Sequence, residues 1–134
     1  MKIIIVFNFL LFSFCLNAQT LSEVKAFELK YQNCLDSGLD MKTCAITFYN
    51  EADELLNLSY KKLKLQLNTS QKRKLLNEQR NWLKKRDKYF EEAFEEAKND
   101  NGGSTLSDDF KMMYFDKKAE FVIERVKELI LKIK

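Results

Sequence analysis

The chain has 134 residues, with 23 Lys and Arg against 20 Asp and Glu, and it contains no Pro, no His and only 3 Gly. Average usage would give roughly seven Pro and nine Gly, so the many tight turns of a sandwich or barrel are excluded and long helices are favoured. The lack of His excludes His-activated nucleophiles, His acid–base catalysis and His-ligated metals.

The first 18 residues are predicted to be a secretory signal peptide. Lys2 supplies a short positive region, residues 3–16 are almost wholly apolar, and cleavage is expected after Ala18. The apolar stretch is short for a transmembrane helix; its retention as a membrane anchor is the alternative. We expect residues 19–134 to form a single exported domain, periplasmic or extracellular, with no membrane span left after cleavage.

Two cysteines, Cys34 and Cys44, stay in the exported chain, because Cys15 leaves with the signal peptide. In an oxidising compartment an even pair is typical of one disulfide, and so short a loop would gain about 3 kcal/mol of stability from it. Free or metal-bound thiols are the alternative. Two thiols without His or further Cys do not complete a zinc site, so we expect neither a metal nor a cofactor.

The first predicted helix covers about residues 21–37, and the second covers about residues 40–67. Thr20 starts the first helix with a capping box, and Gly38 suits its left-handed stop. Asp40 is the expected N-cap of the second helix. Apolar residues recur at helical spacing along both segments, and a tight corner between them would bring the two cysteines together.

The third predicted helix covers about residues 71–98, capped by Thr69 or Ser70. The fourth covers about residues 108–133, capped by Ser107. Short connections join antiparallel neighbours, so the expected fold is all-α: an antiparallel bundle of about four helices with one disulfide. A small core cannot cover every face of such long helices, so we expect an elongated bundle or a homodimer.

Basic residues cluster within residues 61–64, 72–74 and 84–88, and acidic residues follow directly within 91–96. Basic and acidic side chains that alternate along a helix are typical of solvent-exposed faces with (i, i+4) ion pairs. A nucleic-acid footprint is strongly basic without balancing acid, so we expect no nucleic-acid partner.

Two polar rows occupy helix faces where a core would prefer apolar side chains. If the chain turns back near residues 68–70, the residue numbers of two positions that face each other across the hairpin add up to about 138. One register then aligns three polar pairs. We expect an Asp53–Arg86 ion pair and hydrogen bonds among the other four residues. The three pairs of this polar seam are Asp53 with Arg86, Asn57 with Trp82, and Tyr60 with Gln79.

Two interpretations of the polar seam are open. It is a buried network that fixes the register of two helices, with each group satisfied because an unpaired buried charge costs several kcal/mol. Alternatively, it lines a groove for a ligand or partner. Catalysis needs paired carboxylates with separated pKa values in a cleft. The Asp and Glu spacing is that of helix surfaces, so we expect no catalytic residues and no enzyme.

Several short motifs follow one another over nearly all of the exported chain. They are YQNCL at 31–35, MKTC at 41–44, YNEADELLNLSYKKL at 49–63, LLNEQRNWLKKRD at 75–87, GGS at 102–104 and R-x-x-x-L at 125–129. Each is weak alone, but their order and spacing resemble a secreted bacterial family named for the lysozyme inhibitor LprI, specifically its N-terminal domain.

The resemblance implies an all-helical exported domain, a Cys34–Cys44 disulfide and lysozyme inhibition as an activity. Many family members carry a second cysteine pair, with one cysteine just after the R-D motif and one in the last helix. Here Phe90 stands near the first position and the last helix has no Cys, so apolar packing would have to replace that bridge. Val122 replaces a Thr that often precedes the final Arg.

The polar, acidic loop of residues 99–109 is the candidate contact with a partner, because its glycines let backbone approach a cleft closely. A plain interhelical loop is the alternative. Lysozymes are cationic, and the exported chain, with 22 basic and 20 acidic residues after the loss of Lys2, offers no net acidic steering. The loop residues singled out are Asn101, Gly102, Gly103, Ser104, Asp108 and Asp109.

We therefore expect an exported, non-enzymatic binding protein of the bacterial cell envelope, whose partner is a lysozyme, by family resemblance, or another envelope protein. The alternative is a structural or stress-related envelope protein that has no lysozyme target. Neither function needs a catalytic site, a metal or a cofactor.

Overall fold

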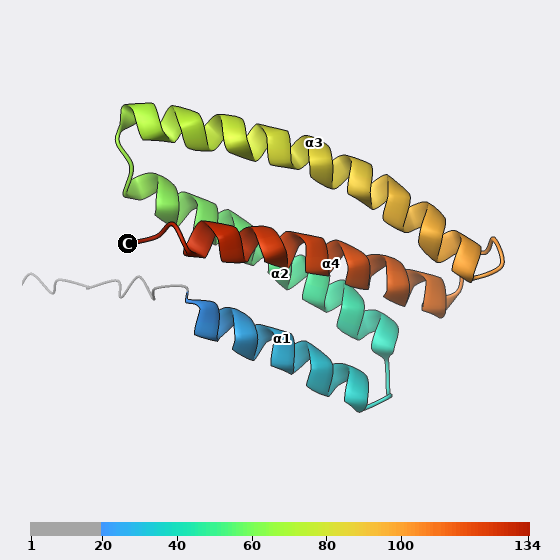
Figure 1. The fold of residues 1–134 in the computed structure, drawn as a ribbon. Helices are drawn as coiled ribbons and strands as arrows, with labels where there is room; N and C mark the ends of the chain where they lie inside the picture. The colour runs from blue at the N-terminus through green and yellow to red at the C-terminus, as the bar shows by residue number, and fades with distance from the viewer. Residues whose placement is uncertain (1–19) are drawn as a thin grey trace, which may run out of the picture.

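The computed structural model describes residues 20–134, which form four helices and no strand (Figure 1). The helices are α1 (Leu21–Asp36), α2 (Met41–Leu65), α3 (Thr69–Asp100) and α4 (Asp108–Ile130). The all-α expectation is confirmed, whereas the predicted signal peptide and its cleavage site lie outside the described residues. Within residues 20–134, every helix is too short or too polar to span a bilayer.

Side chains at the helix starts satisfy backbone N–H groups that have no partner inside the helix. The predicted capping box of α1 is confirmed: Thr20 Oγ1 accepts from the Glu23 N–H at 3.3 Å, and the Glu23 carboxylate accepts from the Thr20 N–H. Asp40 caps α2 by accepting from the Thr43 N–H, and the Ser107 side chain caps α4. Three of the four predicted helix starts are thus correct.

The start of α3 differs from the prediction, because its N-cap is Asn68 rather than Thr69 or Ser70. Asn68 Oδ1 accepts from the Gln71 N–H at 2.9 Å, and Gln71 Oε1 accepts from the Asn68 N–H at 3.0 Å. This reciprocal pair requires Glu or Gln three residues after the cap. Only Asn68 is followed at that spacing by such a residue, since Lys and Arg follow the other two.

The predicted disulfide is confirmed and staples the corner between α1 and α2. Cys34 and Cys44 are bonded, with their Cα atoms 5.9 Å apart. The corner turns at Gly38, whose φ of 66° lies in the left-handed region that glycine adopts without strain. Cys44 is buried and Cys34 is exposed, so the bridge runs from the core to the surface at this corner.

Two helices that run in the same direction, α2 and α4, form the centre of the elongated bundle, and α1 and α3 lie on opposite sides of them (Figure 1). Two contacts fix the register of this parallel pair. Lys42 Nζ lies 3.1 Å from Asp108 Oδ1 near the start of both helices. Beyond their ends, the Gln66 side chain donates to the Lys134 carbonyl oxygen and accepts from its N–H.

Small side chains explain why α2 and α4 approach closely along their length. Ala45, Ala52 and Ser59 recur every seven residues on one face of α2, and none of them is exposed to solvent. The register places Ala119 of α4, which is also fully buried, level with Ala52. The separation of packed helices depends on the side chains between them, so this small-residue row lets the two backbones come together.

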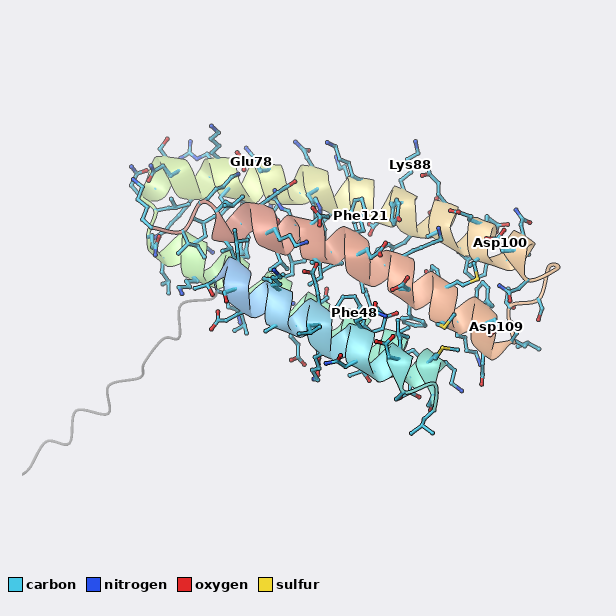
Figure 2. All side chains as sticks on the ribbon, turned by 60° about the horizontal axis from the view of Figure 1, so that its bottom comes forward. Phe48, Glu78, Lys88, Asp100, Asp109 and Phe121 are labelled. Atoms are coloured by element: carbon cyan, nitrogen blue, oxygen red, sulfur yellow. A yellow bond between two sulfur atoms is a disulfide. The ribbon has the colours of Figure 1, made fainter. Side chains whose placement is uncertain are left out.

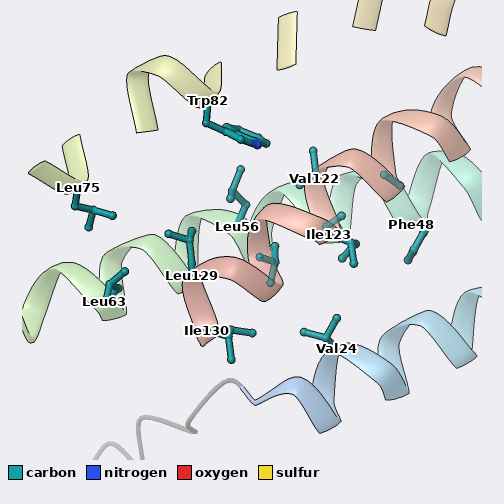
Figure 3. Close-up of a cluster of buried hydrophobic side chains, with 13 residues drawn as sticks. Val24, Phe48, Leu56, Leu63, Leu75, Trp82, Val122, Ile123, Leu129 and Ile130 are labelled. Carbon is teal, nitrogen blue, oxygen red and sulfur yellow. The ribbon is translucent and has the colours of Figure 1, made fainter. Parts of the chain in front are cut away.

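Larger side chains hold α3 away from α2. Leu75 and Trp82 project from α3 over Leu56 and Leu63 of α2 and the adjoining face of α4 (Figure 3). The α3 backbone consequently lies near α4 and only rarely near α2. The expected close packing of the second and third helices is therefore wrong: their side chains meet, but their backbones stay apart. The buried core consists of Val24, Phe48, Ala52, Leu56, Leu63, Leu75, Trp82, Ala119, Val122, Ile123, Val126, Leu129 and Ile130.

The variant Ala52→Leu tests the small-residue row. The larger side chain has no space between α2 and α4, so we expect the free energy of unfolding to fall by roughly 1–3 kcal/mol. Urea denaturation followed by circular dichroism measures this loss. The matched control is Ala26→Leu, the same change at an exposed position of α1, which should stay within about 0.5 kcal/mol. Equal effects of the two variants would contradict the close packing.

Candidate binding surfaces

A lysine ammonium lies among four aromatic rings in the middle of the bundle. Lys118 projects from α4, and its Nζ lies between 4.0 and 4.9 Å from four ring centroids, an arrangement that attracts a cation to the ring faces. The rings are those of Tyr49 from α2, Phe90 from α3, and Tyr114 and Phe115 from α4. The chain's own lysine fills this aromatic box and thereby links α2, α3 and α4.

The charge of Lys118 is influenced by groups that include two members of the predicted polar seam. Burial lowers the pKa of Lys118, and the positive charge of Arg86 lowers that pKa further. The Asp53 carboxylate acts in the opposite direction and favours the charged ammonium. Asp53 and Arg86 therefore act on a third charge, the Lys118 ammonium of α4. The predicted pairing of two helices did not include this charge.

The predicted pairings of the polar seam are wrong. Within the described part of the chain, none of the three pairs forms a hydrogen bond or an ion pair. Asn57 donates instead to the backbone oxygen of Asp53 on its own helix at 2.9 Å. Arg86 Nη2 lies 2.7 Å from Asp87 Oδ1. The physical reason is the separation of α2 from α3, which short carboxylate and amide side chains do not span.

The register behind the prediction is nevertheless close to that of the structure. Tyr49 of α2 and Phe90 of α3, which that register places opposite each other, make an edge-to-face contact with ring centroids 6.0 Å apart. Long aromatic side chains reach where carboxylates do not. The Arg86 guanidinium lies over the Phe90 and Trp82 rings, 5.6 and 5.8 Å from their centroids, and Tyr60 packs half-buried against the core.

Gln79 finds its partner on α4 rather than on α2. Its Oε1 accepts from both Nε and Nη2 of Arg125 at 3.1 Å, and Arg125 Nη1 lies 2.7 Å from Glu128 Oε2. Arg125 is the one charged residue among the described residues that is buried. Beside it, the Trp82 ring stacks on Phe121 with centroids 5.8 Å apart. Whether the six seam residues are purely structural or also line a groove stays a prediction.

Sequence reasoning missed Arg125 as the central member of this network. In the sequence the residue stands out only through the R-x-x-x-L motif at 125–129, which does not indicate its partner. The available signal was its place on the apolar side of the last helix, between Val122 and Leu129, where an unpaired guanidinium would be costly. That position required an acceptor on a neighbouring helix.

The 99–109 loop joins α3 to α4 at one end of the bundle. Asn101 donates to the Ala97 carbonyl oxygen at 2.8 Å and accepts from Ser107 Oγ at 3.3 Å, so the two helix ends are tied across the loop. Gly102 and Gly103 have φ values of 61° and 84°, and a Cβ added at either would meet nothing within 4 Å. The loop thus has a fixed base and an open glycine tip.

The same end carries further exposed residues. The Asp108–Lys42 ion pair brings the loop to the corner between α1 and α2. Leu106 in the loop and Leu39 in that corner are 83% and 90% exposed. Beside the corner, an apolar pocket of about 310 Å³ opens between α1 and α2, lined mainly by Phe27, Tyr31, Cys34, Leu39, Cys44, Thr47 and Phe48.

An acidic groove of about 440 Å³ runs between α1 and α4. Asp116, Glu120 and Glu124 recur every four residues along α4 and line it together with Glu28 of α1. Asp116 accepts a hydrogen bond from the Tyr31 hydroxyl at 2.8 Å. Within residues 20–134, no group of three or more His, Cys, Asp or Glu side chains is arranged to hold a metal ion.

Comparison with family models tests whether the chain belongs to the family that its motifs resemble. A family model described as Lysozyme inhibitor LprI matches residues 32–129, most of the chain. The chain belongs to the LprI family. No curated protein and no solved structure matches it. The family match includes the disulfide, the Gln79–Arg125 contact and the candidate loop up to Asp109.

This LprI family member lacks the second cysteine pair that the resemblance implies for many members, and the structure shows which contacts its α3 residue makes instead. Phe90, near the expected cysteine of α3, contacts Tyr49 and lies 4.8 Å from Lys118 Nζ on α4. A cation–aromatic contact between Lys118 and Phe90 therefore joins α3 to α4 without a covalent bridge. Val122, at the position of the frequent Thr, is fully buried in the core.

The variant Arg125→Ala tests the buried network. Its side chain is 7% exposed, and its removal leaves Gln79 without the buried donor it accepts from, so we expect a loss of roughly 2–4 kcal/mol of unfolding free energy. The control Arg80→Ala, at an exposed position of α3, should change stability by less than about 0.5 kcal/mol. Thermal and urea denaturation measure both. An unaffected Arg125→Ala protein would exclude a structural role for this network.

Proposed function

We propose that this protein is an exported, non-enzymatic binding protein of the bacterial cell envelope that binds and inhibits a lysozyme. The observation that carries the proposal is the LprI family match over residues 32–129. Residues 1–18, with their apolar stretch and cleavage site at Ala18, are proposed to direct export and then to be removed. A disulfide between Cys34 and Cys44 fits an oxidising compartment.

The distribution of charge along the bundle supports a cationic partner. The net charge of the chain is positive, but residues 95–109 contain five acidic side chains and only one basic one. Asp100 and Asp109 lie at the same end of the bundle, where α3 meets α4 (Figure 2). A local acidic end attracts a cationic protein even when the overall charge is positive, so net charge alone gave an incomplete expectation.

The candidate loop at this end has the features that contact with a cleft requires. Its glycine tip at 102–103 is open on the side where a Cβ would stand, so backbone can approach a partner closely. Ser104, Asp108 and Asp109 are exposed around it. Leu106 supplies an exposed apolar side chain of the kind that fills a pocket at the centre of an interface. We propose that this loop enters or covers the lysozyme cleft.

A turbidity assay with a cationic lysozyme and a peptidoglycan suspension tests the proposal. The protein, purified as cells process it and with its N-terminus read by mass spectrometry, should slow clearing in proportion to its concentration. The double variant Asp108→Asn/Asp109→Asn keeps the side-chain shapes and removes two charges, and its helix content and melting temperature are checked by circular dichroism because Asp108 also pairs with Lys42. We expect it to need at least about tenfold more protein for half inhibition, since charge pairs at an interface contribute 1.5 kcal/mol or more.

The matched control is Glu91→Gln/Glu92→Gln, which removes the same charge from exposed positions more than two turns before the end of α3. This control should inhibit like the unchanged protein. Equal losses in both variants would assign the effect to net charge rather than to the loop. No inhibition and no lysozyme binding by the unchanged protein would overturn the proposal and favour the structural envelope protein instead.

A further inference from the structure

The end of the bundle opposite the acidic loop is strongly basic. Residues 55–86, which include the turn between α2 and α3, contain ten Lys and Arg side chains and a single acidic one, Glu78. Glu78 is held by Lys132 Nζ at 2.9 Å, so its charge is already matched by a lysine outside the segment. Glu124 and Glu128 of α4 line a groove together with Lys85. Residues 55–77, around the turn itself, contain six of the ten basic side chains and no acidic one, so the excess of positive charge is concentrated there.

The fold adds the C-terminus to the same end. The Gln66 side chain, in the turn after α2, bonds both the N–H and the carbonyl oxygen of Lys134. This double hydrogen bond places the last residues beside the start of α3. The helix ends that meet here are the end of α2, the start of α3 and the end of α4, as Figure 1 shows.

Exposed leucines lie among these basic side chains. Leu65, the last residue of α2, is 76% exposed, and Leu131, just after α4, is 70% exposed. Folding leaves these two large apolar side chains in water at one end of the molecule. We define the basic tip as exposed Lys61, Lys64, Arg73 and Lys74 together with Leu65 and Leu131.

We propose that the basic tip docks this protein on an anionic phospholipid surface. Basic residues near a bilayer are attracted by its anionic headgroups, and exposed apolar side chains beside them can enter the interfacial region. The combination distinguishes a lipid surface from a soluble polyanion, which has no apolar layer to receive leucines.

The path of the chain supports this orientation. α1 begins at the same end of the bundle as the basic tip (Figure 1), and in the sequence it follows the apolar stretch 3–16 that is proposed to direct export. Export of such a segment takes place at a membrane. The basic tip would then face the bilayer from which the chain emerged, and the acidic loop at the other end of α3 would face away from it.

Vesicle sedimentation tests the docking. The protein, purified as cells process it, is mixed with vesicles of three parts phosphatidylethanolamine to one part phosphatidylglycerol, and in parallel with phosphatidylcholine vesicles. We expect binding to the anionic vesicles only, weakened by added salt because exposed charges are screened. Arg73→Glu/Lys74→Glu should weaken binding at least about twentyfold, since each basic residue contributes roughly fivefold at such a surface.

The matched control is Lys88→Glu/Lys98→Glu, which makes the same change of charge on the same helix away from the basic tip. It should bind vesicles within about twofold of the unchanged protein, and circular dichroism should show both variants folded. A second variant, Leu65→Ser/Leu131→Ser, should lose the part of the binding that persists at high salt.

Three results would overturn the docking. One is equal binding to phosphatidylcholine vesicles, and another is equal loss of binding in the tip variant and the control. The third is capture by a single-stranded oligonucleotide without vesicle binding, which would assign the tip to nucleic acid. The experiment contains no lysozyme, so its outcome is independent of the inhibition assay.

Discussion

The close approach of α2 and α4 is the constraint on which the rest of the molecule depends. A row of small residues, Ala45, Ala52 and Ser59, faces α4 at the level of Ala119 and is wholly buried. Since the chain reverses at every connection, this central pair is parallel and its members are not consecutive. The helices α1 and α3 are left to cover its two sides, and α3 therefore finds its main partner in α4. The buried Arg125 and the aromatic box around Lys118 both follow from that arrangement.

The sequence predicts the elements well because their signals are local. Capping side chains, the glycine at 38 and the spacing of apolar residues act within one or two helical turns, and the four helices lie close to their expected bounds. The disulfide also follows, since its cysteines flank a short corner. Even the facing register of α2 and α3 is close, as the contact of Tyr49 with Phe90 shows.

The candidate site could be predicted less well, because it depends on distances between helices. The same two polar rows would pair directly if α2 and α3 packed closely, but Leu75 and Trp82 hold them apart. Gln79 consequently turns to Arg125 on α4, and Arg86 lies over aromatic rings. Net charge likewise concealed the separation of acidic and basic ends, because the opposite charges nearly cancel in the sum over the chain. The two proposed surfaces, one at each end, would let the protein engage a membrane and a soluble protein at once.

Methyl-to-methyl nuclear Overhauser contacts test the central claim most directly. In protein labelled at Ala, Val and Leu methyl groups, the Ala52 methyl should show strong cross-peaks to Ala119 or Val122 of α4. Such contacts require the two helices to lie side by side at the register that the Lys42–Asp108 pair defines. Cross-peaks from Ala52 to Leu83 of α3, with none to α4, would contradict the account and restore the α2–α3 hairpin as the centre of the bundle.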